Sequence, residues 1–289
     1  MTIKRQVLVT IDEKRANRKA ESPDPGLLDQ ASLESHPQFA STLANGLAIL
    51  GCFRHGQSVL GNKDLSERLG FTRPTVSRLT FTLTGLGYLR RDEGTGKYAL
   101  GPAVLSLGYP LLSQMTVRQV AAPEMLELSR IAHGPVSIGM RDRLQVVYIE
   151  TVHGAETNFT NPGIGSTRPL LRTAMGRALL SVHEADDRIR ILARLRELHR
   201  DDWQKFSHTI GAAIEEIREK GFCTVIGDWQ PNLAAVAVPL RAHFNGVPLA
   251  FNLTLPTYET NEAELNEKFG PRLVNLVRNV ERALGLTPA

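Results

Sequence analysis

The sequence predicts an α+β protein whose two parts differ in character. Residues 41–100 hold three short segments of helical periodicity followed by two short alternating runs, whereas residues 117–286 mix longer helical periods with apolar, strand-like runs. The 289 residues are 42% hydrophobic, which is enough to fill more than one core. We expect a disordered tail over residues 1–40, a small domain over 41–101, a linker helix over 102–116 and an α+β domain over 117–286.

The tail is predicted from the absence of a sustained apolar period in the first 40 residues. Six Lys/Arg and six Asp/Glu are interspersed there, and residues 22–26 are rich in proline. A segment of this composition cannot bury enough apolar surface to offset the entropy lost on ordering. We therefore expect no stable fold before residue 41.

Two short helices are expected after the tail. In residues 41–53, Leu43, Leu47 and Leu50 recur at helical spacing and predict an apolar face. Residues 62–69 predict a second, shorter helix with leucines on one side. Both segments are too short to be stable alone, so we expect them to pack against a third element.

A turn and a third helix follow. Gly70 has no side chain and so permits the positive φ of a helix-ending turn. Thr72 can cap the next helix, and Pro74 is tolerated in its first turn. An apolar stripe then predicts the buried side of this helix, formed by Val76, Leu79, Leu83 and Leu86.

A basic hairpin completes the small domain. Residues 88–100 form two short alternating runs around an acidic, Gly-rich turn, which predicts a β-hairpin. Three short helices followed by a basic hairpin describe a winged helix-turn-helix. Residues 41–100 carry eight Lys/Arg against four Asp/Glu, whereas residues 101–289 carry 20 of each, so the net charge of +4 comes from this part. A basic module beside a neutral body is typical of a DNA-binding protein.

The expected partner is double-stranded DNA, with the third helix in the major groove and the hairpin along the phosphates. Base contacts are expected from the polar face of the third helix, namely Arg73, Thr75, Ser77 and Arg78. Backbone contacts are expected from the hairpin residues Arg90, Arg91 and Lys97. The rival interpretation is a small helical bundle whose charges are merely solvated. The turn at Gly70, the polar third helix and the charge distribution together favour DNA binding.

The larger part predicts a mainly antiparallel sheet with helices. The expected helices cover residues 103–112, 117–130, 173–182, 185–198, 209–220 and 262–284. The expected strands cover residues 135–140, 144–150, 223–226, 233–240 and 248–255. Asn245 and Gly246 predict the turn between the last two strands, Gly221 closes the helix before them, and residues 158–168 read as a polar loop.

No motif predicts catalysis, a cofactor or a metal. GxSxG, HExxH, a Walker loop and a strand-borne GxGxxG are all absent. Cys52 and Cys223 are far apart in sequence, which supports neither a disulfide framework nor a zinc site, and Cys223 is expected to be a small core residue. The histidines are expected at the surface, scattered as His133, His153, His183, His199, His208 and His243. No apolar run approaches the roughly 18 residues of a membrane helix, so we expect no membrane partner and a cytoplasmic protein.

A ligand cavity is the remaining candidate site. Asn252 and Thr254 alternate with apolar residues, so they share one face of the last strand. From the pattern alone, that face is equally consistent with solvent and with a pocket. If it lines a pocket, the two side chains supply the few hydrogen bonds that orient a small molecule. Residues 158–166 are then placed to cover the site and to present backbone N–H groups to an anion.

From about residue 41 to residue 286 the chain resembles the IclR family of bacterial transcriptional regulators. The first matching pieces are Leu47-Ala48-Ile49-Leu50, Thr75-Val76-Ser77-Arg78-Leu79 and Lys97-Tyr98-Ala99-Leu100-Gly101. The later ones are Thr173-Ala174-Met175-Gly176-Arg177-Ala178-Leu179-Leu180 and Val236-Ala237-Val238-Pro239, followed by Asn245-Gly246. Each piece is weak alone, but their order is specific.

The resemblance implies a winged helix-turn-helix, a linker helix and a GAF-like effector-binding domain. It also implies a homodimer or homotetramer on a near-palindromic operator, in agreement with the symmetry expected of half-site recognition. The effector contacts that it implies are Asn161, Gly163, Gly165, Asp228, Ala235, Asn252 and Thr254. One position departs from the family, because Leu171 stands where a histidine is usual and leaves that position without a polar side chain.

The sequence therefore predicts a DNA-binding transcriptional regulator, repressor or activator, controlled by a small organic metabolite. We expect no catalytic step, no cofactor and no metal. Two other classes stay open, which are a metabolite-sensing protein-interaction module and an enzyme that uses the cleft around Asp228.

Overall fold

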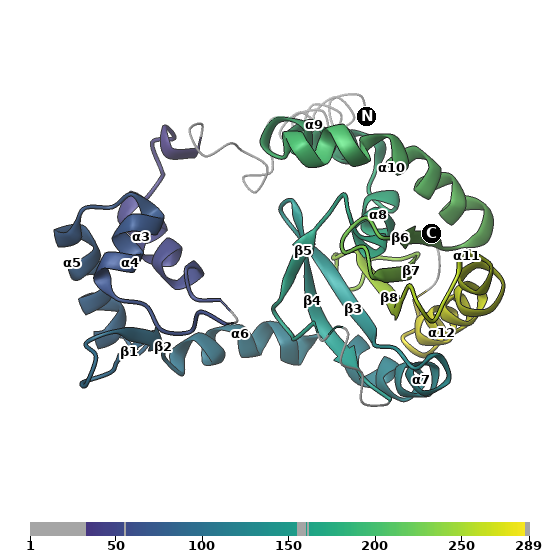
Figure 1. Ribbon diagram of the computed structural model, residues 1–289, viewed down its shortest axis with the longest axis horizontal. Helices are drawn as coiled ribbons and strands as arrows, with labels where there is room; N and C mark the ends of the chain where they lie inside the picture. Colours follow the sequence, from purple (N-terminus) through teal and green to yellow (C-terminus); the bar gives the residue numbers. More distant parts are fainter. Residues whose placement is uncertain (1–32, 55, 155–159, 161, 287–289) are drawn as a thin grey trace, which may run out of the picture. The chain divides into compact units, whose positions relative to one another are not determined.

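The computed structural model describes residues 33–54, 56–154, 160 and 162–286 (Figure 1). The described chain separates into two compact units, which meet in sequence between Gln114 and Met115. Most of the expected tail over residues 1–40 lies outside the described residues.

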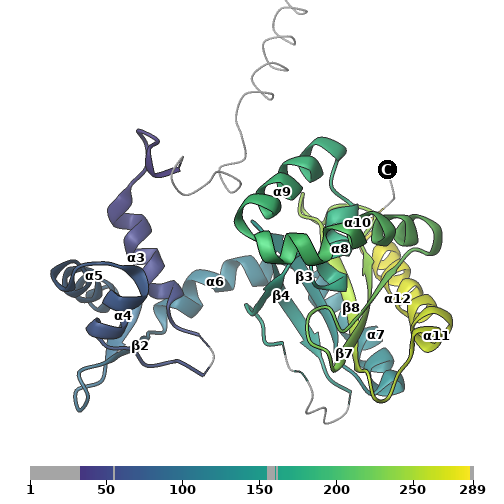
Figure 2. The same cartoon turned by 45° about the horizontal axis from the view of Figure 1, so that its top comes forward.

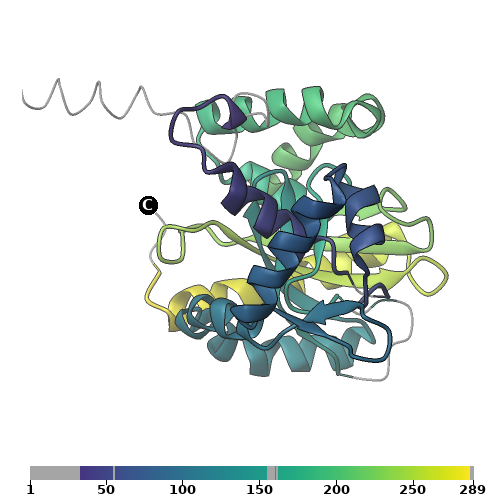
Figure 3. The same ribbon diagram turned by 90° about the vertical axis from the view of Figure 1, so that its left-hand side faces the viewer.

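The first unit is a helix-turn-helix with a short two-stranded hairpin, as predicted. Its elements are α3 (Ser41–Gly51), α4 (Asn62–Leu69), α5 (Arg73–Gly85), β1 (Leu89–Arg91), β2 (Tyr98–Leu100) and α6 (Ala103–Gln114). Strands β1 and β2 pair antiparallel. Figure 3 views this unit from its own side, with its helices in purple and blue. Helices α3, α4 and α5 and the hairpin pack around one hydrophobic core. Its buried residues are Ile49, Cys52, Phe53, Leu60, Leu65, Val76, Leu83, Leu89 and Tyr98.

The predicted turn signals of this unit are confirmed. Gly70 ends α4 with a φ of 69°, in the left-handed region that glycine favours. The hydroxyl of Thr72 accepts a hydrogen bond from the backbone N–H of Thr75 and so caps α5, and Pro74 lies in the first turn of that helix. These local signals explain why the helices begin and end where they do.

The first helix is present as predicted, but of the three leucines that indicated it only Leu50 packs against the core. Leu43 and Leu47 are 64% and 55% exposed, and the buried positions of α3 are Gly46 and Ile49. Leu86, expected at the buried side of the third helix, is also exposed. Periodicity shows which residues share a face, but packing decides which face is covered within the chain.

The second unit is a six-stranded antiparallel sheet with helices on both faces. The strand order is β5-β4-β3-β8-β7-β6. The strands are β3 (Val136–Asp142), β4 (Gln145–Val152), β5 (Thr167–Pro169), β6 (Cys223–Ile226), β7 (Leu233–Pro239) and β8 (Leu249–Pro256). The helices are α7 (Val117–Ala132), α8 (Ala174–Ser181), α9 (Ala185–Leu198), α10 (Arg200–Lys220), α11 (Glu262–Glu264), the π-helical η2 (Leu265–Phe269) and α12 (Gly270–Ala283).

The two faces of the sheet are covered by different helices. Helix α8, backed by α10, lies on one face, and α7 and α12 lie together on the other (Figures 1 and 2). Between β7 and β8, Asn245 and Gly246 both have positive φ, as the predicted hairpin turn requires. Gly221 ends α10 with a φ of 85°. The expected mainly antiparallel sheet is confirmed.

Three elements differ from expectation. Strand β5 overlaps the end of the expected polar loop, and its three residues pair with β4 at an edge of the sheet. Helix α10 begins at Arg200, nine residues before the expected start, since Trp203 and Phe206 extend its apolar side N-terminally. The C-terminal helix contains the π-helical turn η2, which the apolar period does not reveal.

Candidate DNA interface and ligand pocket

Helix α5 presents most of its predicted contact residues to solvent. Arg73, Ser77 and Arg78 are exposed. Neither arginine forms an ion pair within the described residues. Thr75 is half-buried, and its hydroxyl oxygen lies 2.9 Å from that of the capping Thr72. Thr75 is therefore partly engaged in capping, whereas the other three side chains are accessible to base edges.

The hairpin presents its three predicted cations around an ordered turn. Arg90, Arg91 and Lys97 are exposed. One carboxylate oxygen of Asp92 accepts hydrogen bonds from the backbone N–H and the hydroxyl of Thr95, each 2.7 Å long. These bonds hold the pKa of Asp92 below its ordinary value. The acidic residue thus orders the turn, and the basic side chains keep their exposure.

A pocket in the second unit opens on the sheet face that α8 covers. It encloses about 470 Å³, counting its open mouth. Asn252 and Thr254 both line it, and the Asn252 Nδ2 atom donates to Thr254 Oγ1 over 3.0 Å. Ala235 lies opposite Thr254 on β7 and lines the same wall. The other lining residues are Tyr148, Thr160, Pro162, Arg168, Arg172, Thr173, Ala174, Val225, Trp229, Leu233 and Ala234. The face that carries Asn252 and Thr254 thus lines a pocket rather than facing open solvent.

Asp228 lies beside this pocket but does not line it. Its carboxylate forms an ion pair with Arg177, whose side chain is only 5% exposed. The Nε atom of Arg177 also donates to the backbone carbonyl of Leu171 over 3.0 Å. The ion pair of Asp228 therefore anchors residues 227–232 to α8, and the neighbouring Trp229 lines the pocket.

The loop expected to cover the pocket contributes other residues than those predicted. Thr160 and Pro162 line the pocket, whereas Gly163 and Gly165 are exposed and do not. The backbone N–H of Gly165 already donates to the carbonyl of Tyr148 over 2.8 Å. Asn161 lies outside the described residues.

Sequence reasoning missed two arginines of the pocket. Arg172 donates from Nε and Nη2 to the backbone carbonyls of Asp228 and Trp229, over 2.9 and 3.1 Å. Its third nitrogen lies 3.8 Å from a carboxylate oxygen of Asp202. Arg168 lies 5.7 Å from the ring centroids of both Tyr148 and Trp229. No spacing rule reveals these roles, because both depend on partners 20 or more residues away.

The inner wall of the pocket is polar but only partly satisfied. Burial raises the pKa of Tyr148, against the lowering effect of the Arg168 charge and of hydrogen bonding with Asn252. Asn252 is 4% exposed, and its Oδ1 atom has no hydrogen-bond partner in the described part of the chain. A buried acceptor without a partner costs free energy unless a ligand or water supplies a donor.

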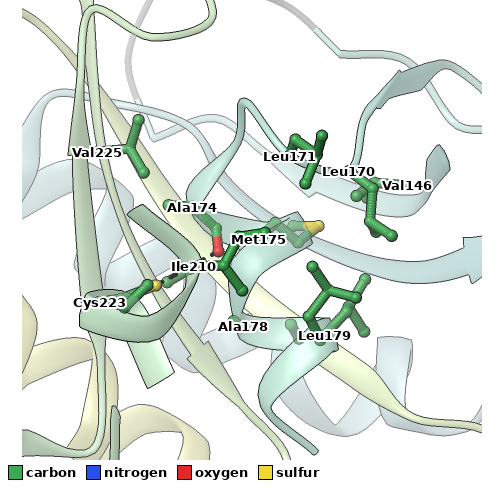
Figure 4. Packing of buried hydrophobic residues seen from close by; sticks show 14 of the residues in the cluster. Val146, Leu170, Leu171, Ala174, Met175, Ala178, Leu179, Ile210, Cys223 and Val225 are labelled. Carbon is green, nitrogen blue, oxygen red and sulfur yellow. Dashed lines mark hydrogen bonds between the residues drawn. The ribbon is translucent and has the colours of Figure 1, made fainter. Parts of the chain in front are cut away.

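The position that departs from the family pattern belongs to the core. Leu171 is 1% exposed and packs in the apolar cluster around α8 (Figure 4). Cys223 lies in the same cluster, as expected for a small core residue. Its burial raises the pKa of the thiol to about 12, so the thiol stays protonated and unreactive at neutral pH.

Of the histidines expected at the surface, four are exposed, whereas His153 and His183 are half-buried. The Nε2 atom of His183 accepts a hydrogen bond from Arg141 over 3.1 Å. Burial first, and the Arg141 charge second, lower its pKa to about 4. Within the described residues, no three metal-binding side chains gather. In the same residues, no helix is both long and apolar enough to cross a membrane.

Comparison with known proteins matches both units. The family description "Bacterial transcriptional regulator IclR C-terminal" covers residues 110–282, and "IclR helix-turn-helix domain" covers residues 42–93. The HTH-type transcriptional regulator TsaQ1/TsaQ2 of Comamonas testosteroni is 32% identical over 250 residues, which are 86% of this chain and 90% of that protein.

Solved structures agree with these matches. An IclR family transcriptional regulator from Brucella abortus is 36% identical, with a TM-score of 0.78 over 91% of this chain and 100% of that one. An IclR homolog from Microbacterium hydrocarbonoxydans, solved in complex with 4-hydroxybenzoate, shares the fold at 18% identity. Its TM-score is 0.67 over 85% of this chain and all of that one.

Proposed function

The chain belongs to the IclR family of bacterial transcriptional regulators, and from this premise we propose that a small organic metabolite controls its binding to DNA. The observation that carries this proposal is the pocket on the α8 face of the sheet, with its unsatisfied Asn252 acceptor. We assign DNA binding to residues 41–101, the linker to residues 102–116 and effector binding to residues 117–286. No catalytic step is part of this proposal.

The first unit supports a division of labour on DNA. Arg73, Ser77 and Arg78 on α5 read base edges in the major groove, and Thr75, whose backbone N–H donates to the capping Thr72, contributes at the same face. Arg90, Arg91 and Lys97 on the hairpin bind the phosphate backbone without regard to sequence. The accessible arginines of α5 match the bidentate recognition of guanine.

The pocket supports a small effector with few polar groups. Its walls combine small apolar side chains with aromatic rings and a few hydrogen-bonding groups, as ligand sites do. The Microbacterium hydrocarbonoxydans homolog, which shares the fold, was solved with the small molecule 4-hydroxybenzoate. A ligand that binds two conformations of the protein with different affinity shifts operator binding by that difference.

Apolar residues exposed on α6 support a homodimer, either alone or within a tetramer. None of the residues of α6 is buried, and Leu105, Leu107, Tyr109 and Leu111 are each more than half exposed. Leu43 and Leu47 on α3 are exposed as well. A second copy that covers such surfaces also provides the two-fold symmetry that a near-palindromic operator requires.

Selection of bound sequences from a random duplex pool tests the proposal. We expect the purified protein to enrich a near-palindromic motif, with affinity that falls steeply as salt rises. We then expect at least one compound of a metabolite panel to change the yield. Enrichment that no metabolite affects would reject effector control. The absence of any enrichment at low salt would favour the protein-interaction module, and consumption of a panel compound would favour the enzyme.

A further inference from the structure

Three arginines approach the pocket, but their charges are not equally compensated. Arg177 is paired with Asp228, and Arg172 is paired with Asp202. Arg168 has one hydrogen bond, from Nη1 to the backbone carbonyl of Thr167 over 2.8 Å. It forms no ion pair within the described residues, and no Asp or Glu of the described chain lines the pocket. Of the three arginines, Arg168 is therefore the one whose charge no carboxylate of the described residues compensates.

The position of Arg168 suits it to meet a ligand. It is half-buried at the edge strand β5, and its guanidinium lies near the Tyr148 and Trp229 rings, which also line the pocket. These rings hold the planar group in place by cation–π attraction and leave most of its N–H donors unused. A half-buried guanidinium with unused donors binds a carboxylate or a similar oxyanion more strongly than any neutral group.

Asn252 adds a second requirement to the pocket. The Asn252 Oδ1 atom is a buried acceptor without a partner, while its Nδ2 atom is occupied by Thr254. A hydroxyl or N–H of the ligand satisfies this acceptor. The small side chains of Ala234 and Ala235 and the ring of Trp229 also line the pocket and favour a flat body.

We propose that Arg168 selects the charge of the effector, so that the pocket takes a flat organic monoanion that also bears a hydrogen-bond donor. Arg172 has a different role, because its Nε and Nη2 atoms donate to the carbonyls of Asp228 and Trp229, and its Nη1 atom lies 3.8 Å from the Asp202 carboxylate. Arg172 is thus a positioning residue for the wall formed by Trp229. This inference rests on the proposed function, since it names the class of ligand for the same pocket.

Matched acids and amides test the charge requirement on the full-length protein. The probes are 4-hydroxybenzoate, 3-hydroxybenzoate and 4-hydroxyphenylacetate, each beside its neutral amide, with affinity measured by calorimetry. We expect at least one acid to bind at least tenfold more tightly than its amide. Arg168→Gln should remove this preference, and Arg168→Lys should keep part of it because the charge remains. Arg143→Gln is the matched control, since Arg143 is exposed at the β3–β4 turn and pairs with Asp142.

Several outcomes would overturn the inference. These are equal binding of acid and amide, a preference that survives in Arg168→Gln, or no binding of any acid. Arg172→Gln should weaken acid and amide alike, so a selective loss of acid binding in that variant would transfer the anion role to Arg172. Amides that bind and alter DNA binding would reject the charge requirement and leave effector control standing. Acids that bind more tightly than their amides but do not alter DNA binding would support the charge requirement and reject effector control.

Discussion

Removing the Asp228 carboxylate should destabilise the second unit strongly. In Asp228→Asn the guanidinium of Arg177, 5% exposed, loses its only carboxylate partner among the described residues. Breaking a buried pair costs about 3–5 kcal/mol, but Asp228 is 27% exposed and Arg177 keeps its bond to Leu171, so we expect about 2–3 kcal/mol. For a unit of this size, that loss lowers the melting temperature by about 4–12 °C.

Tryptophan fluorescence measures this loss in the relevant unit. The chain has two tryptophans, Trp203 on α10 and Trp229 beside the pocket, and both belong to the second unit. Thermal unfolding of the full-length protein, followed at these residues, therefore reports on that unit.

A surface pair provides the matched control. In Asp187→Asn the lost partner is Arg190, and the two side chains are 50% and 56% exposed. Solvent screens such a pair, so the expected cost is below about 1 kcal/mol. Equal, small shifts for Asp228→Asn and Asp187→Asn would refute the structural role of Asp228. If Asp228→Asn greatly lowered effector affinity without lowering stability, Asp228 would instead be a residue that contacts the ligand.

Three further predictions concern DNA binding, packing and pH. Arg78→Ala should cost about 1–3 kcal/mol of binding free energy for the operator, whereas Lys97→Ala should weaken binding to operator and random duplexes alike. If each variant lost the same affinity for operator as for random DNA, the division between base and phosphate contacts would be rejected. Gly176→Ala should lower the melting temperature, because an added Cβ would lie 2.0 Å from a backbone carbonyl oxygen, whereas Gly211→Ala on α10 meets no atom within 4 Å and should be neutral or stabilising. His183 has a lowered folded pKa of about 4, so the unfolded chain binds more protons between the ordinary value of 6.5 and pH 4. Stability should therefore fall as pH drops through that window, and His183→Gln should flatten the pH dependence of urea unfolding.

The small domain could be predicted from the sequence because its signals are local. A left-handed glycine, a capping threonine and an acidic hairpin turn each act through bonds to residues within a few positions, as Gly70, Thr72 and Asp92 do here. The exposure of two α3 leucines could not be predicted, for the opposite reason. Leu43 and Leu47 have the period of a buried face, but whether a face is covered depends on surfaces beyond the helix itself.

The pocket was predictable only where strand geometry decides it. Asn252 and Thr254 share a face because successive side chains of a strand alternate, and their place in the pocket follows from that rule once the sheet is formed. The edge strand β5 escaped prediction because three residues are too few to show a period. The first two turns of α10 escaped because their aromatic residues are separated by charged and polar ones.

The arginines show where sequence reasoning ends. Arg168, Arg172 and Arg177 stand within ten positions of one another, and nothing in the sequence distinguishes their chemistry. Arg177 forms a buried ion pair with Asp228, and Arg172 donates to the backbone carbonyls of residues 228 and 229. Within the described residues, the guanidinium of Arg168 has only a backbone carbonyl and two aromatic rings as partners. Because a charge acts on a ligand only to the extent that the protein leaves it uncompensated, Arg168 is the one of the three whose replacement should change ligand selectivity rather than stability.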